Sequence, residues 1–566
     1  MKHNLLAAAS LLGLVTAGAE PPKTILDLQP FQQTSSLAIK SGDGKEGMAT
    51  LINLNPAVNV WYLLRIAGKD GAAGVTYHLE NPSPATRRLL LDERNPSGLW
   101  IVEGKNRYSC DLFDGSALDQ ARSSRSIYAP LCDSRIYLRN PATGHRTSVE
   151  AATDFLRNQV WGGEEVIVLF HHLMGDMNRE TGQIQAERQA ADASAEHKPG
   201  DVPLSGLIDK EYADRLLTSG NLGIELEAPA YGGMVPGAWY AANGVPGVYV
   251  SIIQPGMIDS AVLQSDKTLA NNLDGVESSS LCYLIAFDLA RFELGFALGT
   301  EHPGVGWSAH IQPQVRDRSL PGPDGIGGIA PLVSTGLVSP ENARRTVATF
   351  TGGFKREHGA FMYGDLALKN HGSHYGFIEN GVVFSKLQQG LATILMLDDG
   401  SIQMKTWTDA DNRLLPQIKH ARQNGVPLIE FGAPGARVAS WGAGNWSGSE
   451  DKKLRTIRAG AALQENAGKR FLIYAVFSDA TPSAMARVFQ AYRCDYAMLL
   501  DMNALEHTYL ALYRRSGSQL LVEHLIKGMS QVDESMSGET VPRFLGFPDN
   551  RDFFYVMRRD AKENNR

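Results

Sequence analysis

The stretch FLIYAVFSDATPSAMARVFQAYRCDYAMLLD, residues 471–501, decides the fold of the C-terminal half. Its first apolar run, Phe471 to Phe477, has the length and continuity of a buried strand. Thr481 and Pro482 suit a helix N-cap and the first helical position. Apolar residues then recur at helical spacing between positions 485 and 492, and a second apolar run follows. A strand, a helix and a strand of these lengths predict a right-handed parallel βαβ unit.

Turn signals before this unit predict further strands. Gly376 to Ser385 has the pattern of a tight hairpin, because Asn380-Gly381 suits the positive φ angles of a type I′ turn. Leu391 to Trp407 predicts a second hairpin, and Leu281 to Leu298 predicts a pair of strands.

The predicted fold class is α+β, with a mixed sheet and a C-terminal βαβ unit preceded by a strand-rich region. Leu414 to Asn424 adds a predicted helix, ended by Gly425. The predicted regions, in chain order, are a signal peptide at 1–19, a strand-rich region of unknown role at 20–180, a polar linker or insertion at 181–206 and a C-terminal domain at 207–566.

The first residues have the features of an export signal. Lys2 is followed by the apolar run Leu5 to Val15 and by the small residues Ala17-Gly18-Ala19, which form a cleavage site. The apolar run is too short to span a bilayer, and we expect no transmembrane segment in the mature chain. The predicted location is therefore periplasmic or secreted.

Composition narrows the classes of partner. The chain has 566 residues, 43% of them hydrophobic and 20% charged, and a formal net charge of -7. This mild acidity gives no electrostatic footprint for nucleic acid, so an anionic ligand needs a local group of basic residues. Nothing in the composition indicates an oligomeric state.

The four cysteines fall into two classes. Cys110 and Cys132 lie in polar, loop-like sequence, and an oxidising compartment favours a disulfide between them. Cys282 and Cys494 open apolar runs, which predicts buried thiols.

The predicted βαβ unit brings polar residues to one edge of its sheet. Both strands of a parallel unit end at the same edge, where open α/β sheets bind ligands, so Thr481 and Asp501 should lie there together. A helix N-terminus offers free N–H groups to a phosphate. Asn503, Glu506 and His507 follow closely and add a second carboxylate and a proton carrier. The alternative is that 501–507 forms only a polar turn.

A second group of candidate residues begins at Thr351-Gly352-Gly353-Phe354-Lys355. Paired glycines allow a ligand to approach the backbone closely, and Lys355 suits an anion. His358, His371 and His374 form a possible metal site, although their spacing matches no closed zinc pattern, and hydrogen-bonded loop histidines are the alternative. We therefore predict no metal or other cofactor.

Two further stretches suit a sugar phosphate. Arg455 and Arg458 have the side chains that clamp a phosphate, and surface ion pairs are their commoner use. Trp441 to Ser449 combines aromatic and small polar residues, which suits stacking against a sugar.

The order of these motifs resembles the phosphodiester glycosidase family over roughly 280–530. The family's Asn-Gly-Gly-Phe-Phe segment is similar to 351–355, and its Arg-Thr followed by glycine is similar to Arg455-Thr456 with Gly460. Its strand ending in Leu-Asp-Gly-Gly-Gly-Ser resembles the strand that ends at Leu500-Asp501. Here Met502-Asn503-Ala504-Leu505 replaces the glycines, so the glycine-lined approach to the substrate is lost.

The resemblance implies an exported hydrolase that cleaves a glycosyl phosphodiester or a related glycan linkage. The predicted catalytic residues are Asp501, its partner carboxylate Glu506, and His374 as a proton donor. The predicted substrate-binding residues are Thr351, Gly352, Gly353, Lys355, Arg455, Arg458 and Asn503.

Two other functions remain open. One is a glycan-binding or envelope assembly protein without turnover, which the altered segment after Asp501 favours. The other is a metal-dependent phosphodiesterase that uses the three histidines. On the hydrolase hypothesis, Asp501→Asn abolishes turnover and leaves the melting temperature unchanged.

Overall fold

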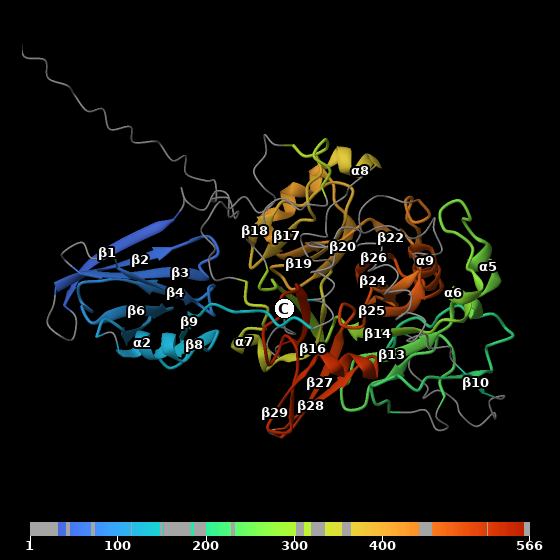
Figure 1. Cartoon of the computed structure of the whole chain (residues 1–566), viewed down its shortest axis with the longest axis horizontal. Coiled ribbons are helices and arrows are strands. Elements are labelled where there is room, and N and C mark those ends of the chain that lie inside the picture. The colour runs from blue at the N-terminus through green and yellow to red at the C-terminus, as the bar shows by residue number, and fades with distance from the viewer. Residues whose placement is uncertain are drawn as a thin grey trace, which may run out of the picture.

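The protein is described from a computed structural model (Figure 1). The residues that it describes are 32–40, 46–68, 74–114, 116–147, 151, 183–185, 200–227, 233–301, 311–317, 334–353, 364–440, 455–517 and 519–559. The predicted signal peptide and most of the predicted linker lie outside these residues. None of the helices in the described part of the chain has the length and apolar character needed to cross a membrane.

Antiparallel sheets dominate the fold, and the predicted α+β class is wrong. Every pairing between named strands is antiparallel, and the longest described helix, α9 (Pro482–Ala491), has 10 residues. The short helices are α2 (Ser116–Ser123), α5 (Ser260–Gln264), α6 (Gly275–Ser279), α7 (Pro340–Ala343), α8 (Gly364–Lys369) and the 3-10 turns η2 (Pro255–Met257), η4 (Asp409–Gln417) and η7 (Lys527–Val532).

The N-terminal region packs two sheets around a core of its own, at the left of Figure 1. The six-stranded sheet contains, in spatial order, β1 (Gln33–Lys40), β2 (Glu46–Asn53), β3 (Trp61–Gly68), β4 (Val75–Glu80), β9 (Ile136–Arg139) and β8 (Tyr128–Leu131). The three-stranded sheet contains β5 (Arg87–Leu90), β6 (Gly98–Glu103) and β7 (Asn106–Asp111).

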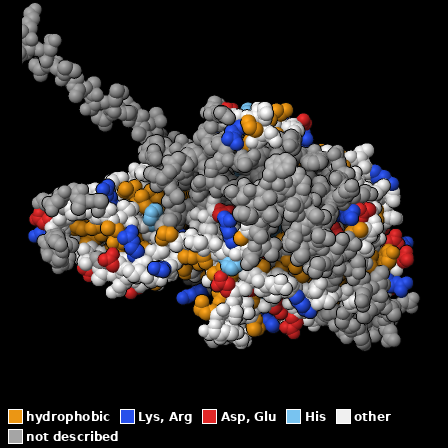
Figure 2. Space-filling view, viewed as in Figure 1, with side chains coloured by type: hydrophobic (Ala, Val, Ile, Leu, Met, Phe, Trp, Pro, Cys, Tyr) orange, Lys and Arg blue, Asp and Glu red, His pale blue; other side chains and the backbone are white. Residues whose placement is uncertain are grey.

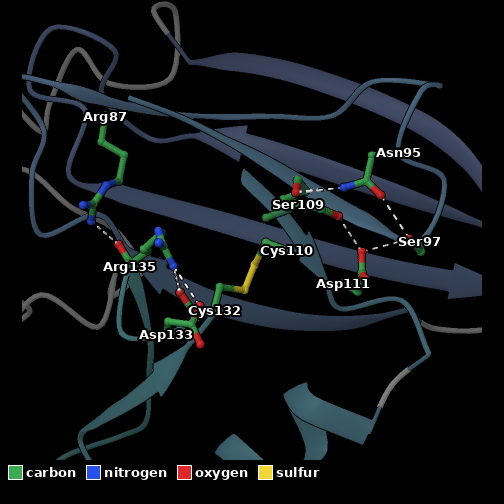
Figure 3. The surroundings of a disulfide bond; sticks show 10 residues. Arg87, Asn95, Ser97, Ser109, Cys110, Asp111, Cys132, Asp133 and Arg135 are labelled. Carbon is green, nitrogen blue, oxygen red and sulfur yellow. Dashed lines mark hydrogen bonds and ion pairs between the residues drawn. A yellow bond between two sulfur atoms is a disulfide. The ribbon is translucent and has the colours of Figure 1, made fainter. Parts of the chain in front are cut away.

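The predicted disulfide between Cys110 and Cys132 is present and joins β7 to the turn after β8 (Figure 3). Ser97 and Ser109 both donate hydrogen bonds to Asp111 beside it. The other two cysteines are free and buried, as predicted.

The remaining chain forms three main sheets, one of eight strands and two of five. The eight-stranded sheet contains β12 (Tyr240–Ala241), β13 (Val248–Ile253), β14 (Cys282–Asp288), β25 (Lys469–Ala480), β24 (Thr456–Asn466), β26 (Tyr496–Met502), β22 (Pro427–Glu430) and β23 (Ala433–Pro434). A five-stranded sheet contains β15 (Phe292–Ala297), β31 (Phe553–Arg558), β16 (Thr346–Thr351), β27 (Leu510–Ser516) and β28 (Gln519–His524). A second contains β18 (Val382–Ser385), β17 (Phe377–Glu379), β21 (Ile418–Gln423), β19 (Ala392–Leu397) and β20 (Ile402–Thr406). Two small hairpin-like pairs complete the strands, β10 (Gln183–Gln185) with β11 (Leu216–Thr218) and β29 (Glu534–Met536) with β30 (Glu539–Val541).

The eight-stranded sheet is buried on both faces. One face packs on the sheet that contains β16, and Phe350 and Tyr474 meet there with ring centroids 4.8 Å apart. The other face packs on α9, whose Met485 and Phe489 belong to a second core cluster. Burial on both faces explains the continuous apolar run in β25.

The strands β25 and β26 flank α9 as predicted, but they do not pair with each other. Both pair antiparallel with β24, which lies between them, so they point in the same direction. Their ends therefore still lie at one edge of the sheet. The two strands predicted at 281–298 also exist, but β14 and β15 belong to different sheets.

The predicted helix at 414–424 is wrong, because Ile418–Gln423 is the strand β21. This segment pairs with both β17 and β19, and five of its six residues are buried. Tertiary pairing on both sides thus overrides its local helical tendency. The two hairpins predicted nearby are confirmed, and Asn380 and Gly381 have φ angles of 48° and 77°.

Candidate functional site

Three chain segments meet near the end of β26. Thr351 ends β16, and the N–H of the next residue, Gly352, donates a hydrogen bond to the carbonyl of Asp552 at 2.8 Å. The Asn424 side chain donates to the carbonyls of Leu499 and Leu500, both at 2.9 Å. The predicted glycine segment therefore lies close to β26, the strand that contains Asp501.

Gly352 and Gly353 allow this close approach. A Cβ atom on Gly353 would lie 3.1 Å from the amide group of Asn424, and its φ angle of 134° disfavours other residues. A Cβ on Gly352 would lie 3.1 Å from the Asp552 carbonyl. Both glycines are therefore needed for close packing of the backbone, independently of any role in binding a ligand.

A cluster of buried ion pairs lies at this junction. We define the buried charge cluster as the three pairs Asp501–Arg551 (2.5 Å), Arg422–Asp552 (3.1 Å) and Arg543–Asp549 (2.7 Å). All six side chains are buried. Burying an ion pair costs desolvation energy that the attraction often fails to recover, so the cluster by itself is weak evidence for stability.

Asp501 is nearly enclosed, with 3% of its surface exposed. One carboxylate oxygen contacts Arg551, and the other accepts a hydrogen bond from the Met502 N–H at 2.9 Å. Burial raises the pKa of the neighbouring Tyr474 hydroxyl, and the charge of Asp501 raises it further. A carboxylate paired in this way holds a guanidinium in place, and it is not placed to act as a proton donor itself.

Glu506 and His507 lie beside the cluster and keep some exposure, 13% and 15% of their side chains. Thr147 donates a hydrogen bond to Glu506 at 2.6 Å, and Arg543 donates to the Glu506 carbonyl. The Nδ1 atom of His507 lies 2.9 Å from the Met502 carbonyl, which can only accept, so Nδ1 carries a proton. In the neutral ring, Nε2 is then an acceptor.

These two side chains lie close to each other, and Nε2 of His507 is buried without a hydrogen-bond partner within the described residues. Nε2 of His507 lies 3.4 Å from a carboxylate oxygen of Glu506. Two acceptors attract each other at this distance only if one of them is protonated. Glu506 and His507 together can therefore accept or deliver a proton at the border of the buried charge cluster.

The predicted anion site at the start of α9 is occupied by the protein itself. Both the N–H and the hydroxyl of Thr481 donate to the carboxylate of Glu277, at 3.0 and 2.7 Å. Arg455 forms an ion pair with Asp274 at 2.5 Å and lies 3.8 Å from Asp479. These groups connect α6 to α9 and to the ends of β24 and β25.

Arg458 and Asn503 lie next to β26. Arg458 is fully buried, and its guanidinium donates to the Ala480 carbonyl at 2.8 Å. Burial lowers the pKa of Arg458 to about 10, and nearby Glu277 opposes this shift. Asn503 has a φ angle of 82°, and its N–H donates to the Ile457 carbonyl. Both residues contribute to the edge of the sheet at Asp501.

The two described candidate histidines differ in burial. His374 is 0% exposed, whereas His371 is exposed and lies 3.7 Å from Asp317. Lys355, His358 and Trp441 to Ser449 fall outside the described residues. Within the described ranges, no three or more His, Cys, Asp or Glu side chains are grouped to hold a metal ion.

The sequence interpretation did not identify the segment Asp549-Asn550-Arg551-Asp552, which supplies half of the cluster. Four polar residues directly before the apolar strand β31 were the available signal. Arg422 was missed because its segment was assigned to a helix. A separate cavity of about 470 Å³ lies away from the cluster, and its lining includes Gln254, Ser278 and Arg487.

Comparison with known proteins gives little guidance to function. No family model and no curated protein matches the chain. The catalytic domain of zebrafish N-acetylglucosamine-1-phosphodiester alpha-N-acetylglucosaminidase, auto-inhibited by its pro-peptide, is 10% identical, with a TM-score of 0.29 over 56% of this chain and 85% of that one. A Burkholderia pseudomallei structure described as an exported protein is 10% identical, with a TM-score of 0.21 over 49% and 74%. The chain thus has a weak structural resemblance to both.

Proposed function

We propose that the chain is an exported hydrolase that cleaves a glycosyl phosphodiester or a related glycan linkage. The observation that carries the proposal is the Glu506–His507 contact at the border of three buried ion pairs. Fixed charges around a proton-transfer group can stabilise a charged transition state without reorganising. The order of the motifs at 351–355, 455–460 and 471–501 supports the substrate class.

In this proposal Glu506 and His507 move the protons. Water adds its oxygen to the anomeric carbon while the bond from that carbon to the phosphate oxygen breaks. The base takes the proton that water loses, and the acid supplies a proton to the departing phosphate monoester if it needs one. The products are a free sugar and a phosphate monoester.

The other candidate residues take positioning or binding roles. Asp501 holds Arg551 through the ion pair at 2.5 Å, so we assign it to positioning rather than to proton transfer. The proposed contacts to the substrate remain Thr351, Gly352, Gly353, Lys355 and Asn503. Arg455 and Arg458 have partners within the fold, and we now propose that they support the edge of the sheet.

The test replaces Glu506 with Gln and follows the release of free sugar from a sugar-1-phosphodiester. We expect the turnover to fall by about 100-fold or more, because acid–base groups contribute factors of this size. The exposed residue Glu539 on β30 gives a matched control, Glu539→Gln, which should keep wild-type turnover. Wild-type turnover in both Glu506→Gln and His507→Gln would exclude this pair from the reaction.

A second candidate is a glycan-binding protein without turnover. The enclosure of Asp501 and its pairing with Arg551 favour this alternative. Calorimetric titration of the full chain with envelope oligosaccharides, together with analysis of the products, separates the two candidates. Binding without any released sugar would support the second.

A further inference from the structure

Five arginines surround one small cavity on the body of the molecule. The cavity has a volume of about 240 Å³, and we define the arginine pocket by the arginines that line it, namely Arg344, Arg345, Arg514, Arg515 and Arg558. They come from the turn after α7 and from the strands β27 and β31, which both pair with β16; α7, β16 and β27 are labelled near the bottom centre of Figure 1. None of the described residues that line the cavity is acidic.

The strand register in the sheet that contains β16 explains why the five arginines meet. Thr346 at the start of β16 pairs with Met557 near the end of β31, and Ala348 pairs with Leu512 of β27. The residues just before Thr346 and just after Met557 and Leu512 therefore lie at one end of the sheet. Gly244 lies against the Arg514 side chain, because a Cβ there would be 2.8 Å from its Cδ.

Carboxylates balance only part of the positive charge of the arginine pocket. Arg345 pairs with Glu293, and Arg514 pairs with Glu225 at 3.2 Å. Arg515 donates to the Ala343 carbonyl at 2.9 Å, which adds no negative charge. Within the described part of the chain, Arg344, Arg515 and Arg558 form no ion pair with a carboxylate.

The Nε atom of Arg514 is a second observation that favours an anion in the arginine pocket. It is buried and has no hydrogen-bond partner within the described residues. A buried donor without an acceptor costs free energy, and an oxyanion in the pocket would supply acceptors. Figure 2 shows basic and acidic side chains interspersed over the described surface on the face that it views.

We propose that the arginine pocket binds a phosphate group. Guanidinium groups present paired N–H donors that match phosphate oxygens, and several of them around one anion offset their mutual repulsion. The volume is below the 300–1,000 Å³ or so of pockets that enclose a whole drug-sized ligand, so the pocket takes a single charged group. The phosphate is either free or the phosphate monoester of a sugar.

This site is separate from the candidate functional site. The six residues of β16 connect the two, with the arginine pocket before Thr346 and the buried charge cluster beyond Thr351. An extended strand of this length spans roughly 17 Å. The inference therefore goes beyond the proposed hydrolysis and does not depend on it.

The test is calorimetric titration of the full chain at low ionic strength with two probes, inorganic phosphate and glucose 6-phosphate. We expect saturable binding of one equivalent, at least tenfold weaker in Arg344→Gln/Arg515→Gln. The exposed residue Arg413 in η4 gives the matched control, Arg413→Gln, which should bind like the wild type. Tighter binding of one probe identifies the source of the phosphate.

Melting temperatures separate a binding role from a structural one. Phosphate should raise the melting temperature of the wild type and of Arg413→Gln, and not that of the double variant. Without phosphate, the double variant should be at least as stable as the wild type, because two like charges are gone. No saturable binding of either probe, or equal binding in the double variant, would overturn the proposal.

Discussion

At the scale of single residues, the partner of Asp501 decides what this carboxylate can do. Its neighbour Arg551 lies 50 positions away in the sequence and neutralises it at 2.5 Å in the interior. An asparagine at position 501 would leave the guanidinium buried without its counter-charge. The sequence alone led us to expect that Asp501→Asn leaves the melting temperature unchanged. With the ion pair to Arg551 known, we expect a loss of stability instead.

We expect Asp501→Asn to lower the free energy of unfolding by about 3–5 kcal/mol, the usual cost of breaking a buried pair. Urea denaturation measures this change. Asp365→Asn is the matched control, because Asp365 is 74% exposed and its pair with Arg437 should matter little.

Addition of Arg551→Gln to Asp501→Asn should restore part of the lost stability, because it removes the unpaired charge. A loss for Asp501→Asn no larger than that of the control, with no recovery in the double variant, would contradict a stabilising contact between the two residues.

At the scale of elements, α9 packs unusually close to the eight-stranded sheet at Gly460. A Cβ atom on this residue of β24 would lie 3.0 Å from the Met498 carbonyl, from Met485 Cε and from Phe489 Cε2. The family resemblance placed Gly460 in the motif that begins at Arg455-Thr456. Its contacts show that it lets the helix and two strands approach one another.

Gly460→Ala should therefore destabilise the protein by about 1–3 kcal/mol, the usual cost of overpacking a core. Alanine otherwise suits a strand interior better than glycine, so a loss must come from the close contacts. Gly275→Ala in α6 is the control, because no atom outside its chain neighbours and the backbone of its own helix lies within 4 Å of the added Cβ. Equal melting temperatures for both variants would show that the helix moves aside without cost.

At the scale of the whole molecule, the N-terminal sheet is joined to the body through buried polar groups as well as apolar contacts. Trp61 packs on Phe384 with ring centroids 5.9 Å apart, and Tyr128 lies 3.4 Å from Thr335. Glu379 lies at this junction, with its carboxylate accepting a hydrogen bond from the Leu298 N–H.

Burial raises the pKa of Glu379 from 4.5 to about 8, with a smaller contribution from the neighbouring charge of Glu80. Asp552 adds to this increase, whereas the Leu298 hydrogen bond and Arg139 oppose it. The folded protein thus retains a proton on Glu379 that the unfolded chain has lost above pH 4.5. The stability from this group is complete below pH 4.5 and is lost as the pH rises to about 8.

We expect the wild type to lose up to about 1.4 kcal/mol for each pH unit in this range relative to Glu379→Gln, whose amide does not titrate. Unfolding measured for both proteins between pH 5 and 8.5 isolates this contribution, because their other groups are the same. A constant difference between them across the range would rule out the raised pKa.

Sequence reasoning located part of the candidate site because some signals are local. Asp501 and the glycine pair 352–353 each follow an apolar run, so the neighbouring residues alone mark them as lying at the end of a buried strand. Nothing in the sequence matched Arg551, Asp552 and Arg422 to their partners, since these ion pairs join residues from 50 to 130 positions apart. Only packing decides which of many arginines and carboxylates meet.

The sequence alone determined the elements whose signals lie within a few residues. These are the helix that begins at Thr481-Pro482, the hairpin at Asn380-Gly381, the apolar strands on either side of α9, and the cysteine pair in polar sequence. Their physical basis is short-range, because backbone angles, capping and periodic burial depend on nearby residues.

The tertiary structure alone decided how the strands pair. It inserted β24 between β25 and β26, separated β14 from β15, and made 418–423 a strand. The free energy that settles these choices comes from burying side chains of distant segments against each other. No local pattern contains that information, and the mostly antiparallel β fold and the buried charge cluster follow from it.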